Sequence, residues 1–500
     1  MKYVKNRQII IICIVFSLFL GVSIYMMTGS AYGFATIVIP VACYLLTSPK
    51  SVVFIALVFT MVFPQWLAPK IGSGNISFSW GLGDIIILAV GLMIFIGYGI
   101  ECRTISKAKD YDNYYILLFF ILLIPSRFID LVSGVGPLLV VGNLFKDLEP
   151  FILFFAVYKW FKGNDKFKIA YWLLAINILI NIVAVIQITN PTLYSLIIHN
   201  TTSADTASYI DTFMFGRVAS TLMNPGTFAW YLTIMTPFLI FQFLKKEVKI
   251  RMAFLIVCIW DVILLIFTLS RTQWLALLAE GVVLFVYLLK TAKRKSNMLR
   301  VTIFIAVIIG LGIYVMNEYG TIIYRRINLV NVENLYQYGK FTLGYSMAFR
   351  IEALKAGIYA LKSNWLFGAG QSNIISVLHQ AMIDSGTSLS FISSSPSLHN
   401  QVLNYVLRCG VPLGVLVIRC WIRLYRHYVK NQSIRLLINM LFVGLLVSGL
   451  TGEILNSARI LSIVFIIFAY CKVEIEEDGK IENRVYNGDG SNGNWREVYN

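Results

Sequence analysis

The chain has 500 residues, of which 58% are hydrophobic and 13% are charged. Soluble domains carry about a quarter charged residues, so this composition, with a mean hydropathy of +0.74, excludes an ordinary soluble protein and indicates a polytopic membrane protein. The net charge of +17 raises nucleic acid as a partner. However, the basic residues cluster between apolar runs, as they do in the cytoplasmic loops of membrane proteins, and we expect no nucleic-acid partner.

Apolar runs of membrane-spanning length recur along the chain. Their residues do not alternate between polar and apolar as the strands of a membrane barrel would, so the predicted fold class is all-α, a polytopic transmembrane helical bundle. A span needs roughly 20 apolar residues, and the sixth and the last of the runs are short by this measure. We predict about fourteen spans (12–14), near residues 8–27, 31–47, 51–67, 83–100, 113–126, 148–161, 169–188, 226–244, 252–270, 273–289, 301–317, 401–418, 436–452 and 457–471.

Clusters of lysine and arginine predict the orientation of the bundle. All of them fall on one side of a fourteen-span arrangement, which predicts that this side and both termini are cytoplasmic. The predicted location is therefore the plasma (inner) membrane, with multiple passes. The clusters begin at Lys2, Arg103, Lys159, Lys245, Lys290 and Arg419.

This orientation divides the chain into four parts. They are the first eleven spans with short loops (1–317), a large external loop (318–400), the last three spans (401–472) and a polar tail expected to be disordered and cytoplasmic (473–500). Long loops between spans are uncommon, and one of this length indicates a site built at the membrane surface. Helical spacing of apolar residues in the loop predicts an amphipathic helix over 347–362 and a second helix over 373–383.

The external side holds few basic residues, so each one needs an explanation. Arg271, next to Ser270 at the end of an apolar run, either snorkels to the interface or binds an anion. A guanidinium suits phosphate because its fork matches two oxygens and it does not lose its charge. Arg217 is the only lysine or arginine in the loop 189–225, and Arg350 lies at the start of the predicted amphipathic helix.

Arg325 and Arg326 form a looser pair just beyond a predicted span. Pairs in this position are more often interfacial anchors than ligands. We retain them as candidate substrate-binding residues of lower rank than the three isolated arginines.

His399 is one of four histidines and lies beside Asn400 at the predicted start of a span. An imidazole titrates near neutrality and can accept or donate a proton. His379 has a weaker claim, because a solvated helix in a loop explains it, and His199 is expected on a loop surface. His399 is therefore the candidate general acid or base.

Asp261 and Glu280 fall within predicted spans, where ionisable groups are costly and often functional. Structural pairing explains them equally well, and their roles stay open. No external group of Asp, Glu and His has the spacing of metal ligands. We therefore expect no metal or other cofactor, and phosphate chemistry on this side would depend on arginine.

Several of these segments resemble one known family when they are taken in order. The segment 267–275, with its Ser270-Arg271 pair, is similar to the Ser-Arg turn of the O-antigen ligase and polymerase (Wzy/WaaL-like) superfamily. Further likenesses lie in Arg350-Ile351-Glu352-Ala353-Leu354 followed by Leu366-Phe367-Gly368-Ala369-Gly370, in His399-Asn400 followed by Gly410, and in Arg217 followed by Asn224-Pro225. The resemblance covers residues 210–420, whereas the first 200 residues match in hydropathy alone.

The resemblance implies glycan transfer from an undecaprenyl-diphosphate-linked oligosaccharide at the outer face of the plasma membrane. Our leading hypothesis is a repeat-unit polymerase for O antigen, capsule or exopolysaccharide. The alternative is a ligase that transfers finished glycan to a lipid or protein acceptor. A non-catalytic transporter or flippase is the rival from another class, but it should show internal repeats and broken polar helices at mid-membrane.

The expected partners are the lipid-linked oligosaccharide and the lipid bilayer, with a chain-length regulator or a flippase as further candidates. The expected catalytic residues are His399, Arg271 and Arg217. The expected substrate-binding residues are Arg350, Asn400, Ser270, Arg325 and Arg326.

Overall fold

The structure, a computed structural model, describes most of the chain from residue 49 onward. The described residues are 49–62, 70–73, 76–79, 83–84, 86–88, 90–91, 94, 111–161, 166–194, 217–245, 248, 250–291, 343–387 and 397–486. The predicted spans at 8–27, 31–47 and 301–317 lie outside these residues.

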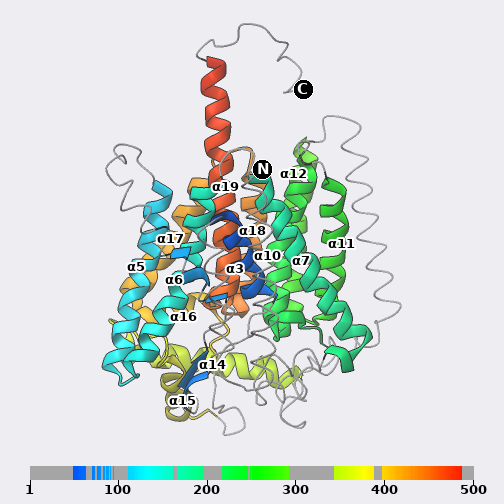
Figure 1. The fold of residues 1–500 in the computed structure, drawn as a ribbon. Helices are drawn as coiled ribbons and strands as arrows, with labels where there is room; N and C mark the ends of the chain where they lie inside the picture. The colour runs from blue at the N-terminus through cyan, green and yellow to red at the C-terminus, as the bar shows by residue number, and fades with distance from the viewer. Residues whose placement is uncertain are drawn as a thin grey trace, which may run out of the picture.

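The described chain is predominantly helical and forms one bundle (Figure 1). Its α-helices are α3 (Pro49–Met61), α5 (Tyr111–Val132), α6 (Pro137–Trp160), α7 (Lys166–Thr189), α10 (Pro225–Leu244), α11 (Arg251–Phe267), α12 (Arg271–Thr291), α14 (Leu343–Asn364), α15 (Ile374–Asp384), α16 (Gln401–Cys409), α17 (Val411–Tyr428), α18 (Arg435–Thr451) and α19 (Ala458–Tyr486). Two short 3-10 helices are η2 (Ser220–Leu222) and η5 (Ile454–Asn456). The strands β1 (Lys70–Ser73) and β2 (Ile76–Ser79) pair antiparallel, a small sheet that the all-α prediction did not include.

Several helices are long and apolar enough to cross a membrane. Four of those described meet this test over Tyr114–Val132, Phe167–Thr189, Pro225–Leu244 and Arg271–Lys290. A helix of about 20 residues spans the ~30 Å of bilayer hydrocarbon. Their length and composition indicate a multi-pass membrane protein.

α10 lies in the middle of the bundle, and its side chains from Tyr231 to Gln242 are all buried. Some of the polar groups around it are paired across helices. Gln273 of α12 accepts hydrogen bonds from the hydroxyl groups of Thr233 on α10, at 3.1 Å, and Ser448 on α18, at 2.7 Å. Such bonds hold helices together where lipid offers polar groups no partner.

The two ends of the bundle differ in what they hold. At one end, Tyr158 near the end of α6 donates to Glu476 of α19 at 2.5 Å, and Lys245 after α10 forms an ion pair with Glu474. The C-terminal halves of these three helices therefore lie together, and α19 projects from this end (Figure 1). The turn between α11 and α12 lies at the other end, where α14 and α15 cross the bundle (Figure 1).

Two predicted elements differ from the structure in a way that has a physical explanation. The predicted span 401–418 is two helices, α16 and α17, because Gly410 between them has a φ of +82° and breaks the helix. The tail predicted as disordered from residue 473 is helical up to Tyr486. Its first turns are held by the contacts of Glu474 and Glu476 with neighbouring helices.

The runs predicted as short are also longer in the structure. The run at 148–161 is the second half of α6, which has 24 residues, and the run at 457–471 opens α19, which has 29. The two helices predicted in the 318–400 loop are present as α14 and α15.

Candidate functional site

The first component of the candidate site is the tight turn between α11 and α12. Leu269 has a φ of +54°, a left-handed conformation that a branched residue adopts only when its surroundings require it. The carbonyl oxygen of Ser270 accepts from the N–H groups of Gln273, at 3.0 Å, and Trp274, at 3.1 Å. The turn therefore ends at once in α12, with the half-buried Arg271 as its first residue.

Arg217 lies directly against this turn. Its Nε donates to the carbonyl oxygen of Thr268 at 2.9 Å, and the N–H of Val218 donates to Phe267 at 3.1 Å. Gln187 of α7 supports the segment, because its Oε1 accepts from the N–H groups of Ala219, at 2.8 Å, and Ser220, at 2.9 Å. The structure therefore brings Arg217 to the segment that carries Ser270 and Arg271.

The Asn224-Pro225 pair, which follows Arg217 in sequence, has a structural explanation. Asn224 is the N-cap of α10, and its Oδ1 accepts from the N–H groups of Gly226, at 2.7 Å, and Thr227, at 3.2 Å. Pro225 occupies the first position of the helix, where its missing N–H costs nothing. This pair begins α10 at the level of the turn.

Arg350 of α14 lies close enough to Arg271 for their charges to interact. Burial lowers the pKa of the Arg350 guanidinium, and the positive charge of Arg271 lowers this pKa further. The Arg350 Nε is buried and has no hydrogen-bond partner within the described part of the chain. Two neighbouring guanidinium groups, one with a buried unused donor, form an arrangement that an anion would stabilise.

His399 lies close enough to Arg350 for the charge of the guanidinium to act on the imidazole. Its ring meets that of Phe349 edge to face, with centroids 6.1 Å apart. Burial lowers the pKa of His399 from 6.5 to about 4, with a further lowering by the charge of Arg350. The imidazole is therefore neutral at pH 7 and has a lone pair that can accept a proton.

The backbone of His399 is held in an unusual conformation by a single carboxylate. Its φ is +51°, which is uncommon for a residue other than glycine. Oε1 of Glu453 accepts from the N–H of Leu398 at 2.6 Å, the N–H of His399 at 3.2 Å and the hydroxyl of Ser397 at 3.0 Å. The turn between α18 and α19 thereby fixes the position from which the imidazole projects.

Asn400 is engaged by the backbone on both sides of its amide. Its Oδ1 accepts from the N–H of Leu403 at 2.9 Å and caps α16, while its Nδ2 donates to the carbonyl oxygen of Leu450 at 3.2 Å. The next residue, Gln401, donates to Asn456 at 3.3 Å and accepts from the N–H of Leu455 at 2.8 Å. In this structure Asn400 anchors the segment that carries His399.

Two glycines of the segments that resemble the family pack closely against each other. Gly368 and Gly410 have φ values of +83° and +82°, and a Cβ on either one would collide with the backbone of the other's segment. The N–H of Val411 donates to Trp365 at 2.7 Å, and that of Ala369 donates to Leu407 at 2.7 Å. These contacts join the end of α14 to the break between α16 and α17, so that two distant sequence motifs form one structural unit.

The structure therefore gathers most of the candidate residues at one end of the bundle. Arg217 binds the turn that carries Ser270 and leads into α12, and charge interactions link Arg271 to Arg350 and Arg350 to His399. Arg325 and Arg326 lie outside the described residues.

Three residues that support this site were not predicted from the sequence. They are Glu453, Gln187 and Thr268. An isolated carboxylate in a short turn on the side predicted to be external was the available signal for Glu453. Gln187 and Thr268 carried no such signal. Within the described ranges, no three side chains of His, Cys, Asp or Glu lie together as metal ligands would.

Comparison with known protein families gives a match. Residues 253–418 match the family model described as O-antigen ligase. This segment includes Arg271, Arg350 and His399, whereas Arg217 and Glu453 lie outside it. A search among curated proteins gave no match. The match over residues 253–418 supports membership of the chain in the superfamily of O-antigen ligases and polymerases.

Proposed function

We propose that the chain is a polysaccharide repeat-unit polymerase that uses an undecaprenyl-diphosphate-linked glycan as its donor. The observation that carries the proposal is a chain of charge interactions at one end of the bundle, in which Arg271 acts on Arg350 and Arg350 acts on a half-buried His399. Glycan transfer needs positive charge where the diphosphate leaves and a base for the acceptor hydroxyl. This group of residues supplies both.

The proposed reaction is a displacement at C1 of the donor sugar. The acceptor hydroxyl oxygen forms the new bond to C1, while the bond between C1 and the diphosphate oxygen breaks. The electron pair leaves with undecaprenyl diphosphate, and the hydroxyl proton passes to the free nitrogen of His399. Arg271 and Arg350 stabilise the charge that develops on the diphosphate.

Arg217 acts on the same turn in this proposal. Its Nε is bound to the carbonyl oxygen of Thr268, so it fixes the backbone from which Arg271 projects. We assign it to diphosphate binding together with Arg271. We expect no metal, because the arginines already supply the positive charge that a divalent ion would otherwise provide at a diphosphate.

A ligase that transfers finished glycan to a lipid or protein acceptor is the second candidate, and the description of the matching family favours it. The two activities differ in the acceptor. Purified protein given only lipid-linked repeat units should yield a ladder of longer lipid-linked chains if it is a polymerase. A ligase should leave the repeat units unchanged until a separate acceptor is added, and loss of donor label without glycan transfer would contradict both.

We further propose that the end holding His399 faces the outside of the plasma membrane and that both chain termini are cytoplasmic. The support is that the basic segments at Lys159 and Lys245 lie at the other end of the bundle. A cysteine in place of the exposed Ser376 on α15, in a background without the native cysteines, tests this orientation. An impermeant thiol reagent should label it in spheroplasts, and labelling only after lysis would contradict the orientation.

A further inference from the structure

The helix α15 begins without a cap of its own. Asn373 occupies its N-cap position but makes no capping hydrogen bond with its side chain. The segment that leads into α15 is bound instead from α5, where Oδ1 of Asp130 accepts from the N–H groups of Ser372, at 2.7 Å, and Asn373, at 3.2 Å. Oδ2 of Asp130 accepts from the hydroxyl of Ser372 at 3.0 Å. A carboxylate here also complements the positive end of the helix dipole.

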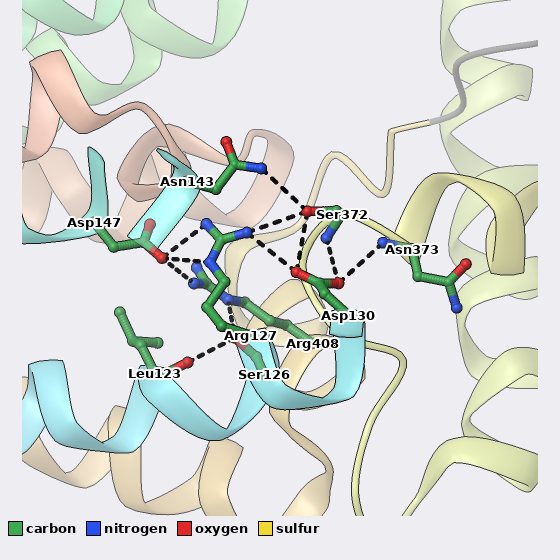
Figure 2. A network of polar contacts seen from close by, with 9 residues as sticks. All are labelled: Leu123, Ser126, Arg127, Asp130, Asn143, Asp147, Ser372, Asn373 and Arg408. Carbon is green, nitrogen blue, oxygen red and sulfur yellow. Dashed lines mark hydrogen bonds and ion pairs between the residues drawn. The ribbon is translucent and has the colours of Figure 1, made fainter. Parts of the chain in front are cut away.

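Asp130 is fully buried and belongs to an ion-pair network between helices (Figure 2). Arg127 contacts Asp130 at 3.2 Å and Asp147 of α6 at 2.7 Å. Asp147 also pairs with Arg408 of α16 at 2.9 Å. Arg127 therefore fixes the carboxylate of Asp130 from within the bundle. The bonds that this carboxylate accepts from Ser372 and Asn373 connect it to the start of α15.

The segment before α15 is shaped to reach this carboxylate. Gly370 has a φ of +81°, and a Cβ at this position would collide with the side chain of Asp130. The N–H of Gly370 donates to the carbonyl oxygen of Arg408 at 3.1 Å. Residues 368–373 thus pass between α5 and the end of α16, with Asp130 at the point of closest approach.

The contact of Asp130 with the segment before α15 also affects the position of Arg350. α14 and α15 share one small apolar core with Leu398, the residue before His399, and its members on the two helices include Ala356 and Leu378. Gly357 of α14 admits the side chain of Leu398 where a Cβ would collide with it. Arg350 is on the same helix, so a shift of α14 and α15 moves its guanidinium relative to the imidazole.

We propose that Asp130 is a positioning residue that docks α14 and α15 to the bundle by binding residues 372–373, just before α15, from α5, and thereby holds Arg350 beside His399. Among the described contacts, Asp130 touches none of the proposed reacting groups and acts through this helix pair. The inference rests on the proposed function for its effect on catalysis, while the docking itself can be measured without any substrate.

The test uses the full chain in lipid nanodiscs, with Asp130→Asn and Ser372→Ala as the variants. Asp130→Asn removes the charge with little change of shape, and Ser372→Ala removes a single hydroxyl, so at least one of them should fold. Asp147→Asn is the matched control, because Asp147 belongs to the same network but has no bond to residues 368–373 among the described contacts. The first readout is hydrogen exchange of the amides in α14 and α15.

We expect the two docking variants to speed exchange in α15 by roughly tenfold or more, since Asp130→Asn weakens the charge-assisted bonds to residues 372–373 and Ser372→Ala removes the hydroxyl bond to Asp130. Asp147→Asn should lower the thermal midpoint without this local change. The second readout is transfer from lipid-linked donor, in which the docking variants should lose kcat while KM changes less, because Arg350 is proposed to act as the diphosphate leaves.

A third readout separates positioning from a general loss of folded protein. The charge of Arg350 acts on His399, the charge of Arg271 acts on Arg350, and the carboxylate of Glu453 binds the backbone N–H of His399. If Arg350 withdraws, the acid limb of the rate profile should move up toward pH 6.5, whereas partial unfolding would lower the rate equally at every pH.

Unchanged exchange in α15 with Asp130→Asn would overturn the docking. Faster exchange with a normal rate and a normal pH profile would overturn the positioning. If Asp147→Asn reproduced all three changes, the network would have only a general structural role and the proposal would be wrong. Faster exchange in a protein whose wild type shows no transfer at all would instead count against the proposed function.

Discussion

Oε1 of Glu453 accepts a hydrogen bond from the backbone N–H of His399 at 3.2 Å, across 54 residues of sequence and from a different turn of the fold. The same oxygen also binds the N–H of Leu398, and Oε2 accepts from Nδ2 of Asn456 at 2.9 Å. A residue with a positive φ persists only where its surroundings hold it there. The position of the imidazole is therefore set by the turn between α18 and α19.

The first prediction concerns this carboxylate. Glu453→Gln should lower the transfer rate about tenfold or more, since the three bonds to Oε1 lose the charge that makes each worth about 1.5–3 kcal/mol and the segment before α16 would relax. Glu352→Gln is the matched control, because that carboxylate pairs with Lys355 on the surface of α14. Equal rates for both variants at equal protein levels would show that Glu453 does not hold the site.

The second prediction concerns the fork of Arg271. Arg271→Lys keeps the charge but loses bidentate binding of the diphosphate. We expect a fall in rate of about 10²–10³, the typical effect of losing one preorganised donor to a developing charge. Arg423→Lys, on an exposed position of α17, should be silent. A fully active Arg271→Ala at normal expression would leave only the snorkelling interpretation.

The third prediction is the pH dependence. The pKa of His399 is lowered to about 4 by burial and by Arg350, so the base form persists well below pH 6.5. The acid limb of kcat/KM, which reports the free enzyme, should therefore lie near pH 4–5. Bound diphosphate offsets the charge of Arg350, so the acid limb of the kcat profile should lie at a higher pH than the acid limb of kcat/KM.

The lowered pKa of His399 also determines how the stability of the folded protein changes with pH. The folded pKa is below the unfolded value, so the unfolded state binds more protons and stability falls as the pH drops from about 6.5 to about 4. Arg350→Gln should move the acid limb upward, toward pH 6.5. A limb near 6.5 in the wild-type protein, unmoved by Arg350→Gln, would contradict the coupling of these two residues.

The fourth prediction is independence from metal ions. The proposed charge stabilisation comes from arginines, so transfer by purified protein should survive EDTA at unchanged rate. The measurement is product formation with and without the chelator, followed by addition of Mg²⁺ or Mn²⁺. Activity that is lost with EDTA and restored by either ion would count against the mechanism.

The sequence predicted individual helices better than it predicted contacts between residues that are far apart in the chain. The spacing of apolar residues in 347–362 predicted α14, because one helix face packs against Leu398 and Leu403 and the pattern is local. The isolated arginines were predicted as site residues because they fall on the side predicted to be external, where basic residues are few. Their approach to His399 depends on how α12, α14 and the segment before α16 pack, which the sequence pattern did not specify.

The errors have the same origin. The apolar run 401–418 was predicted as one span, but Gly410 fits against Leu366 from another segment and divides it. The polar end of α19 was predicted as disordered, but Glu474 and Glu476 bind Lys245 and Tyr158 on other helices. Glu453 was missed as a site residue because its three hydrogen-bond partners in 397–399 are distant in sequence.

The most direct test of the account is the transfer rate of His399→Ala, measured with purified protein and lipid-linked donor beside His379→Ala on α15 as the control. A general base contributes about 10²–10⁴ in rate, so we predict a loss of this size for His399→Ala, with normal membrane insertion and an unchanged rate for the control. Product of normal length and amount from His399→Ala, together with a loss for His379→Ala, would contradict the assignment of His399 as the proton acceptor.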